Sequence, residues 1–339
     1  MYLRNCWYVA ATGDELGRKP LSRRLLGEPL VLFRTDAGIP LAMFDVCPHR
    51  SLPLSMGEVV GDRLRCGYHG LEFEPGGACV RIPAQTHIPR AWRVKTYPLV
   101  DRWRWVWIWM GDPARADPAR IPDMHWNDDP AWTYTGGHFE IKCDYQLLVD
   151  NLLDLSHETF VHRSTIGNDA VAETPVETTV EGQTVRVDRL MRNCPPPPLY
   201  QKLRSFPGNI DRSQKIRFAP PSHIVIASRS TPHGNNDPDA ALEYRVVNGI
   251  TPASESVCHH FWSVPRNFAH DPDVTAMFHK GSVTAFSEDI VVLEAQQAAM
   301  REHGASIRWQ NFNADAGGVA ARRIVDALSR QEAGEGQSS

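Results

Sequence analysis

Two cysteines and two histidines within one short stretch constrain the fold of this chain more than any other feature. They form a Cys-x-His pair and a Cys-x-x-His pair in "CPHRSLPLSMGEVVGDRLRCGYHG", residues 47–70. Pairs of this kind at short spacing are metal ligands, most often of structural zinc. This segment is therefore expected to fold around a metal.

The order of the ligands favours an iron–sulfur cluster over zinc. In a Rieske [2Fe–2S] centre, two Cys hold one iron and two neutral His hold the other, in this sequence order. Gly67 and Gly70 lack side chains and would let backbone N–H groups approach the cluster's sulfurs. The predicted ligands are Cys47, His49, Cys66 and His69. The cysteines without comparable spacing are interpreted as structural thiols: Cys6, Cys79, Cys143, Cys194 and Cys258.

Length and hydrophobic content predict two domains. A chain of 339 residues with 42% hydrophobic content can bury a large core. Residues 1–112 read as short strands with turns, including a hairpin with its turn at Asp36 to Gly38. The alternate tryptophans of "DRWRWVWIWMGDP" predict a strand whose rings pack in the core, and "DPARADPARIPD" predicts a linker. We expect a small all-β Rieske domain here.

Residues 113–330 predict a second domain of α+β class that carries the catalytic site. Strand-like runs such as "TVEGQTVRVDRL" and "HIVIAS" alternate with loops, and helical patterns lie near residues 146–163 and 283–302. The polar tail, residues 331–339, is expected to be disordered.

Charge and apolar content exclude several function classes. The net charge is −4 without runs of like charge, so no nucleic-acid or anionic membrane surface is indicated. No apolar stretch approaches the ~20 residues of a membrane span, and the N-terminus does not resemble a secretory signal. Seven Cys, an odd number at irregular positions, suit a reducing compartment. We expect a cytoplasmic enzyme.

The segment "QLLVDNLLDLSHETFVH", residues 146–162, predicts a buried helix with a polar face. Asp150, Asp154 and His157 fall within about 60° of one another around a helix. A solvated face is the simpler interpretation, but the apolar remainder favours burial beside a cation. His157 and His162 lie about 140° apart on a regular helix, so a shared ion requires a break, which we expect near Phe160.

A second carboxylate comes from "AFSEDIVVLEAQQ". Asp289 shares a helix face with apolar neighbours, and Glu288 is a rival that spacing does not exclude. Two His and one carboxylate form the facial triad of non-haem Fe(II) oxygenases, which leaves positions free for O₂. The neighbours on that face are Ala285, Phe286, Leu293, Gln296 and Met300.

These motifs together resemble the Rieske non-haem iron aromatic oxygenases. Their "N-x-x-D-x-x-H-x-x-x-x-H" pattern matches Asn151, Asp154, His157 and His162, and Asp289 matches their later Asp. The chain is most similar to the vanillate O-demethylase branch, which includes dicamba and toluenesulfonate monooxygenases. The resemblance implies a helix-grip-like catalytic domain with an antiparallel sheet, and mononuclear Fe(II) held by His157, His162 and Asp289.

The same resemblance implies a homotrimer in which electrons pass between neighbouring subunits. His69 of one subunit would bond Asp154 of the next, and Asp154 would bond His157. Asp154 and Asn151 are thus given catalytic roles. No G-x-G-x-x-G loop and no second Cys set of ferredoxin type occur, so a separate NAD(P)H-dependent reductase of flavin and ferredoxin type is expected.

The implied reaction is oxidative O-demethylation of a methoxylated, vanillate-like aromatic acid with release of formaldehyde. Methyl or ring hydroxylation of another small aromatic carboxylate or sulfonate is an alternative. A Rieske electron carrier without oxygen chemistry is a third, but it has no use for two His and a carboxylate. Candidate pocket residues lie between 190 and 285 and include His259, His260 and Trp262. An Arg or His there could meet the acid group.

Overall fold

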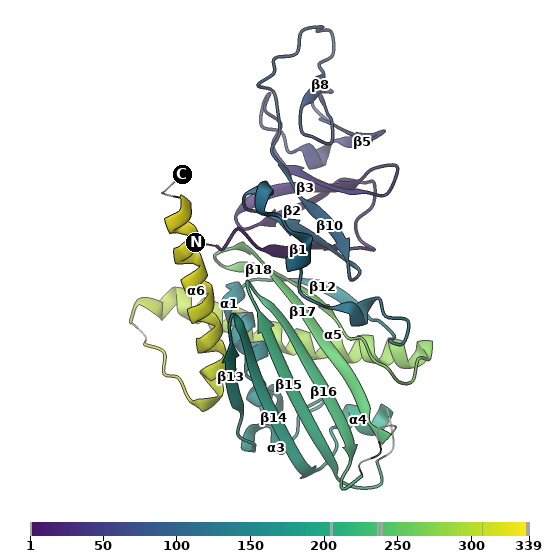
Figure 1. The fold of residues 1–339 in the computed structure, drawn as a ribbon, viewed down its shortest axis with the longest axis vertical. Helices are drawn as coiled ribbons and strands as arrows, with labels where there is room; N and C mark the ends of the chain where they lie inside the picture. Colours follow the sequence, from purple (N-terminus) through teal and green to yellow (C-terminus); the bar gives the residue numbers. More distant parts are fainter. Residues whose placement is uncertain (1, 204–205, 236, 238–239, 307, 337–339) are drawn as a thin grey trace. The chain divides into compact units, whose positions relative to one another are not determined.

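The computed structural model describes residues 2–203, 206–235, 237, 240–306 and 308–336. The chain divides into two compact units. The N-terminal unit comprises Tyr2–Ile121 with Thr251–Ser254, and the catalytic unit comprises Pro122–Ile250 with the chain from Glu255 onward (Figure 1). No helix in these described ranges is long and apolar enough to cross a membrane.

The N-terminal unit is built from three small sheets, with strand orders β1-β11-β10, β2-β3-β4-β9 and β5-β6-β7-β8. The predicted small β domain is therefore confirmed. Short 3₁₀ turns, η1 (Leu54–Met56), η2 (Pro113–Arg115) and η3 (Pro118–Arg120), lie between and after the strands. The strands are β1 (Trp7–Thr12), β2 (Leu21–Leu25), β3 (Glu28–Arg34), β4 (Pro40–Phe44), β5 (Glu58–Val60), β6 (Arg63–Arg65), β7 (Glu72–Phe73), β8 (Cys79–Arg81), β9 (Thr96–Tyr97), β10 (Leu99–Arg102) and β11 (Trp105–Trp109).

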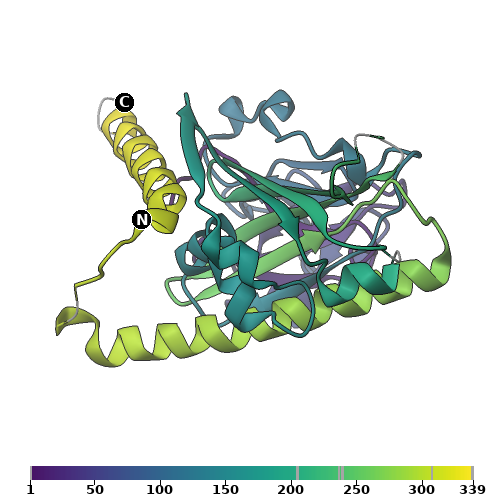
Figure 2. The ribbon, with the colours of Figure 1, turned by 90° about the horizontal axis from the view of Figure 1, so that it is seen from below.

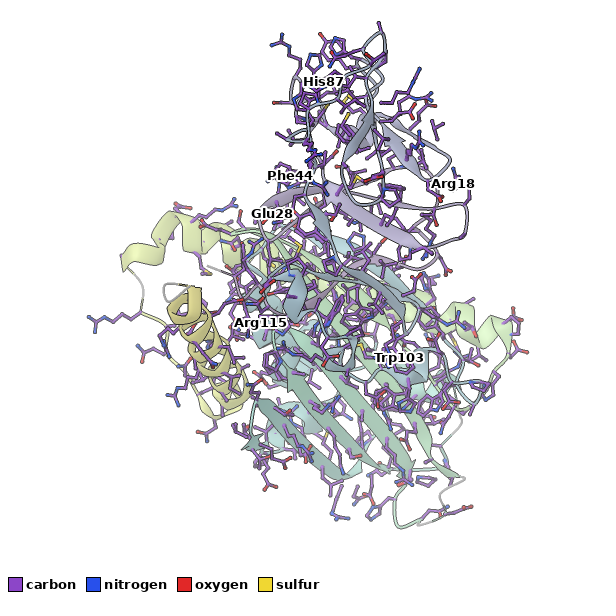
Figure 3. The ribbon with its side chains drawn as sticks, turned by 45° about the horizontal axis from the view of Figure 1, so that its top comes forward. Arg18, Glu28, Phe44, His87, Trp103 and Arg115 are labelled. Atoms are coloured by element: carbon purple, nitrogen blue, oxygen red, sulfur yellow. The ribbon has the colours of Figure 1, made fainter. Side chains whose placement is uncertain are left out.

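Two sequence predictions in this unit are confirmed. Strands β3 and β4 pair as an antiparallel hairpin, and Gly38 in the turn between them has a φ of 80°, which favours glycine. Trp105, Trp107 and Trp109 are fully buried, so β11 is a core strand. Trp103 lies outside the strand, in the turn before it (Figure 3).

The catalytic unit is a seven-stranded antiparallel sheet with helices, in the order β12-β18-β17-β16-β15-β14-β13. The α+β prediction is confirmed. The strands are β12 (Gly136–Ile141), β13 (Glu177–Glu181), β14 (Thr184–Cys194), β15 (Ile210–Ala219), β16 (His223–Pro232), β17 (Leu242–Ser254) and β18 (Val257–Ser263). The helices are α1 (Tyr145–Leu153), η5 (Leu155–His157), α2 (Glu158–Val161), α3 (Asp169–Glu173), α4 (Pro198–Leu203), α5 (Pro272–His303) and α6 (Ala316–Gly336).

Helix α5 runs along one side of this sheet (Figure 2) and begins eleven residues before the predicted helix. Asp271 caps its N-terminus by accepting from the Asp273 N–H at 2.7 Å, and Pro272 occupies the first turn. This start signal was present in the sequence. The buried face includes Gln297 instead of the expected Gln296, which is exposed.

Helix α6 was not predicted. Ala321 and Val325 on α6 are buried in the core of the catalytic unit. A Cβ at Gly317 would lie 2.6 Å from Val187, so the helix begins in close contact with β14. The expected disordered tail is wrong for residues 331–336, because α6 continues through Gly336, while residues 337–339 lie outside the described chain.

Candidate functional site

The two loops that carry the Cys and His pairs have the same backbone design. In each, the Cys N–H donates to a carbonyl five residues later, and the residue four positions on donates back to the Cys carbonyl, at N···O distances of 2.8–3.1 Å. Ser51 and Gly70 close the loops with φ values of 58° and 70°. The bonds join Cys47 to Leu52 and Ser51, and Cys66 to Leu71 and Gly70.

The loops bury their sulfurs and present their imidazoles. Cys47 and Cys66 are each 2% exposed, while His69 is exposed and its ring centroid lies 4.5 Å from that of His49. The Nδ1 atom of His49 is buried without a hydrogen-bond partner, as expected of a nitrogen that a metal would satisfy. Burial, reinforced by Cys66, raises the pKa of the Cys47 thiol to about 11. A thiolate there therefore needs a bound cation.

The four Cys and His donors are the ligand set of a two-metal cluster. Among the residues that the structure describes, the three donors gathered within 4.8 Å of one another belong to His157, His162 and Asp289, and the four Cys and His donors do not form such a group. A [2Fe–2S] cluster spreads its ligands over two metals. The second loop also requires Gly67, because a Cβ there would lie 2.7 Å from the carbonyl oxygen of Met56 in η1.

The second site begins where α1 stops. The helix ends at Leu153, and Asp154 is extended, with φ −122° and ψ 102°; its carboxylate caps η5 by accepting from the Ser156 N–H at 2.8 Å. Helix α2 then ends at Val161, and His162 is non-helical. The break expected near Phe160 thus lies at His162, and a second, unpredicted break lies at Asp154.

These breaks separate residues that the helical pattern had placed on one face. His157 turns toward Asp289, with Nε2 3.3 Å from the carboxylate, whereas Asp150 pairs with Arg322 on α6. The predicted common face of Asp150, Asp154 and His157 was therefore wrong, because a face requires an unbroken helix.

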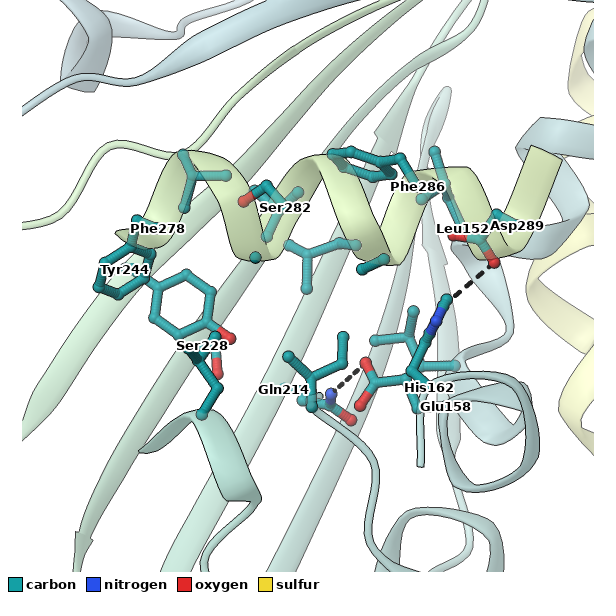
Figure 4. Close-up of a pocket in the computed structure, with 18 of the residues that line it drawn as sticks. Leu152, Glu158, His162, Gln214, Ser228, Tyr244, Phe278, Ser282, Phe286 and Asp289 are labelled. Atoms are coloured by element: carbon teal, nitrogen blue, oxygen red, sulfur yellow. Dashed lines mark hydrogen bonds and ion pairs between the residues drawn. The ribbon is translucent and has the colours of Figure 1, made fainter. Parts of the chain in front are cut away.

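His157, His162 and Asp289 form a triad of side chains that could hold one metal ion. The Nε2 atom of His162 lies 3.1 Å from Asp289 Oδ1, and His162 and Asp289 are 2% and 5% exposed (Figure 4). Their three donor atoms all lie within 4.8 Å of one another. Two imidazoles and one carboxylate on one side of a cavity are the donor set of non-haem Fe(II).

Charge compensation supports the same assignment. Burial alone would raise the pKa of Asp289, but hydrogen bonds from His157 and His162 outweigh it and hold that pKa well below its ordinary value. Burial opposes protonation of His162, yet Asp289 and Glu288 raise its pKa to about 9. The buried carboxylate thus requires positive charge, which a metal displacing the imidazole protons would supply.

Three neighbours hold the triad in place. Glu288 Oε2 lies 2.8 Å from His162 Nδ1, on the side of the ring away from Asp289, so Glu288 orients His162 and lies outside the donor set. His157 Nδ1 lies 2.7 Å from the Asp154 carbonyl oxygen. The Asn151 amide donates to Asp289 Oδ1 at 3.2 Å.

A mostly apolar cavity borders the triad (Figure 4). The sheet contributes four polar residues to the cavity wall: Arg212 and Gln214 on β15, Ser228 on β16 and Tyr244 on β17. The sequence analysis named none of the four. Arg212 and Gln214 are two residues apart, which is the spacing of side chains on one face of a strand. The remaining wall residues are Leu152, Leu155, Glu158, Ile166, Leu199, Ile226, Val246, Val264, Phe278, Gly281, Ser282, Ala285 and Phe286.

His259, His260 and Trp262, named from the sequence as pocket candidates, lie on β18 and do not line this cavity. All three are at most 2% exposed. His260 Nε2 lies 2.9 Å from Asn248 Oδ1, and burial lowers the His260 pKa to about 3, so this imidazole is a neutral core group.

The one Arg in the cavity wall is already paired. Arg212 donates to Glu158 Oε2 at 3.0 Å, and Gln214 donates to Glu158 Oε1 at 2.8 Å. Arg212 and Glu158 are 1% and 4% exposed. The pair fastens α2 to β15 and leaves the guanidinium with its charge compensated.

Comparison with known proteins agrees with this geometry. Residues 6–98 match the Rieske [2Fe-2S] domain, and residues 141–331 match the vanillate O-demethylase oxygenase C-terminal domain. The vanillate O-demethylase oxygenase subunit of Pseudomonas sp. (strain HR199 / DSM 7063) is 40% identical over 99% of this chain and 98% of its own. The iron–sulfur subunit of the toluene-4-sulfonate monooxygenase system of Comamonas testosteroni is 39% identical over 98% and 99%.

A solved structure provides the corresponding match in three dimensions. Dicamba monooxygenase bound to 3,6-dichlorosalicylic acid superimposes with a TM-score of 0.94 at 36% identity, over 98% of this chain and 99% of that one. Another solved structure of dicamba monooxygenase, described as containing non-heme iron and dicamba, matches with a TM-score of 0.87. From its two metal centres and these matches, the chain belongs to the vanillate O-demethylase oxygenase family of Rieske non-haem iron oxygenases.

Proposed function

We propose that this chain is the terminal oxygenase that removes the methyl group from a methoxylated aromatic acid such as vanillate. The observation that carries the proposal is the apolar cavity whose end is formed by His157, His162 and Asp289. Relatives that are named as vanillate and dicamba O-demethylase oxygenase components align over nearly the whole chain.

The overall reaction balances with one O₂ and two electrons. The methoxy carbon is hydroxylated, O₂ is reduced with two electrons and two protons, and one oxygen leaves as water. The resulting hemiacetal loses formaldehyde as its C–O bond to the methyl carbon breaks, which leaves the phenol. When bound, the mononuclear iron supplies O₂ activation and the Rieske cluster supplies electrons. The apolar walls hold the ring so that the methyl carbon faces the triad.

We further propose that a separate NAD(P)H-dependent reductase of flavin and ferredoxin type feeds the cluster, and that the chain works as a homotrimer. His69 and Tyr68 are exposed beside the cluster loops, and Phe160 is 76% exposed beside the triad. These exposed groups suit contact between His69 of one subunit and Asp154 of the next. None of the seven cysteines, all of which the structure describes, forms a disulfide, which supports a cytoplasmic location.

The proposed electron transfer from His69 of one subunit through Asp154 of the next is tested with Asp154→Asn. Its cluster spectrum and iron content should stay near wild type, while a pre-reduced cluster should no longer be oxidised when substrate and O₂ are added. Loss of iron would instead assign Asp154 to the metal shell. Chains with His69→Ala and chains with His162→Ala, when co-expressed, should regain part of the activity in mixed trimers. A monomer with full activity would refute electron transfer between subunits of a trimer.

The alternative reaction is methyl or ring hydroxylation, which the toluene-4-sulfonate relative favours. The two are separated by supplying reductase, NADH and O₂ with methoxy, methyl and unsubstituted aromatic acids. The proposal predicts one phenol and one formaldehyde per O₂ from vanillate. Hydroxymethyl products or ring diols without formaldehyde would establish the alternative.

A further inference from the structure

Three buried hydroxyls gather at the end of the cavity away from the triad. The Tyr200 hydroxyl lies 2.6 Å from that of Tyr244 and 3.0 Å from Ser228 Oγ. We call these residues the hydroxyl trio. Ser228 and Tyr244 line the cavity, and Figure 4 shows them at the opposite end from His162 and Asp289.

The trio can donate to a ligand. Each hydroxyl carries one proton that rotates about its C–O bond, so Ser228 or Tyr244 can turn its proton from a neighbour into the cavity. Burial and the adjacent Tyr200 raise the pKa of Tyr244 well above its ordinary value, so this hydroxyl stays protonated. The cavity therefore offers neutral donors at this end.

A positive charge lies behind these donors. The Arg212 guanidinium lies 5.1 Å from the centre of the Tyr200 ring, and its charge favours negative charge at the Tyr244 oxygen. Arg212 is itself held by Glu158 and cannot turn toward a ligand without breaking that pair. An anionic oxygen bound here would accept hydrogen bonds from the hydroxyls, while Arg212 stays paired with Glu158.

Helix α5 relates the two ends of the cavity. Phe278 packs on the Tyr244 ring at 5.9 Å, and Asp289 lies eleven residues further along the same helix. At the rise of an α-helix this is about 16 Å along the axis. Between them the cavity is bordered by Ser282, Ala285 and Phe286.

We propose that the hydroxyl trio binds the carboxylate of the aromatic substrate and so sets which carbon faces the metal triad. This rests on the proposed function, in that the substrate is a methoxylated aromatic acid. Recognition by neutral hydroxyls replaces the Arg or His contact expected from the sequence.

The test compares vanillate with guaiacol, which is the same ring without the carboxylate. Binding of each is measured by anaerobic calorimetry on the iron-loaded trimer. Wild type should bind vanillate more tightly than guaiacol. Tyr244→Phe should weaken vanillate binding by about 10- to 100-fold, as for hydrogen bonds to charged groups, and leave guaiacol unchanged. Ser228→Ala should act in the same direction, and it serves as the second variant if Tyr244→Phe does not fold.

The matched control is Tyr8→Phe in the N-terminal unit, which removes a buried hydroxyl that donates to the Leu3 carbonyl at 2.6 Å. It should change neither affinity. Equal weakening of both ligands by Tyr244→Phe and Ser228→Ala, or no preference of wild type for the acid, would overturn the inference. Vanillate binding that depends on Tyr244 without any formaldehyde would refute the proposed function and leave the inference standing.

Discussion

The two metal centres differ in how far apart their ligands lie along the chain. The cluster ligands come from two short loops, residues 47–52 and 66–71, and each loop is closed by its own backbone hydrogen bonds. The triad joins His157 and His162 to Asp289, which lies on a helix more than 120 residues later. The first centre depends on local turns, whereas the second depends on packing of α5 against the sheet.

Burial differs in the same way. At the cluster the imidazole of His69 faces solvent, which suits electron transfer to or from a partner. At the triad His162 and Asp289 are buried, and the adjoining cavity is mostly apolar. The cluster site, whose ligands lie close together in the sequence, is thus partly exposed. The triad, whose residues lie far apart in the sequence, is mostly buried.

The largest expected effects come from removing one centre at a time. Asp289→Ala should lose the mononuclear iron and all turnover while it keeps the visible absorption of the cluster, because each cluster loop is closed by its own backbone hydrogen bonds. Cys66→Ser should lose the cluster and turnover while it keeps iron at the triad. Iron and sulfide analysis with absorption spectra measures both. Loss of both metals in either variant would contradict independent centres.

The next effect tests the long-range contacts of the triad. Arg212→Met should leave Glu158 buried without its cation and cost about 3–5 kcal/mol of unfolding free energy. Because Glu158 follows His157 directly, triad iron should also fall while the cluster spectrum is retained. Scanning calorimetry and iron analysis are the measurements. The control Arg18→Ala removes an exposed pair with Asp36 in the N-terminal unit and should cost at most about 1 kcal/mol. Equal losses of unfolding free energy in Arg212→Met and Arg18→Ala would show that the buried pair stabilises the fold no more than the exposed one.

A smaller effect is expected at Glu288, which orients His162 through its Nδ1 atom. Glu288→Gln should weaken Fe(II) binding at the triad by about 10- to 100-fold, the usual cost of losing such a partner. Competitive Fe(II) titration of the cluster-loaded protein measures it. Glu302→Gln, an exposed change on the same helix, is the control. Complete loss of iron would make Glu288 a ligand.

The smallest effect is a dependence of stability on pH in protein without the mononuclear iron. The folded-state pKa of His162 is raised to about 9, so its stabilising contribution is fully present below about pH 6.5 and is lost as pH rises through 9. The melting temperature of the catalytic unit should therefore fall between pH 6.5 and 9.5, relative to a His162→Asn variant. Iron affinity should rise over the same range, because fewer protons must be displaced. A difference in melting temperature between wild type and His162→Asn that does not change with pH would be evidence against the raised pKa of His162.

The contrast between the centres also explains what could be predicted from the sequence. Cys47, His49, Cys66 and His69 lie in one short stretch, so their spacing indicated a metal site and their order favoured a [2Fe–2S] cluster over zinc. His157 and His162 were suggested by spacing, but the choice of Asp289 over Glu288 needed the family pattern. The break at Asp154 was missed because a side chain that caps η5 looks, in a periodic count, like one more polar residue of a helix.

The cavity and α6 were missed for a different reason. Arg212, Ser228 and Tyr244 lie on three strands, and nothing local shows that these strands are neighbours with their alternate residues facing α5. Their partners are also distant in the chain: Glu158 lies 54 residues from Arg212, and Tyr200 lies 28 and 44 residues from Ser228 and Tyr244. Helix α6 carries two glycines in its first turn, a composition that disfavours helix. It is explained by the close contact of Gly317 with Val187 on β14 and of Gly318 with Asp150 on α1.

The central claim is that one chain holds a [2Fe–2S] Rieske cluster and a separate mononuclear iron. The most direct measurement is the iron, zinc and acid-labile sulfide content of the fully loaded protein, together with its visible spectrum. We predict three irons and two sulfides per chain, with cluster absorption that persists when the triad iron is removed by a mild chelator. Stoichiometric zinc without sulfide or visible absorption would contradict the account.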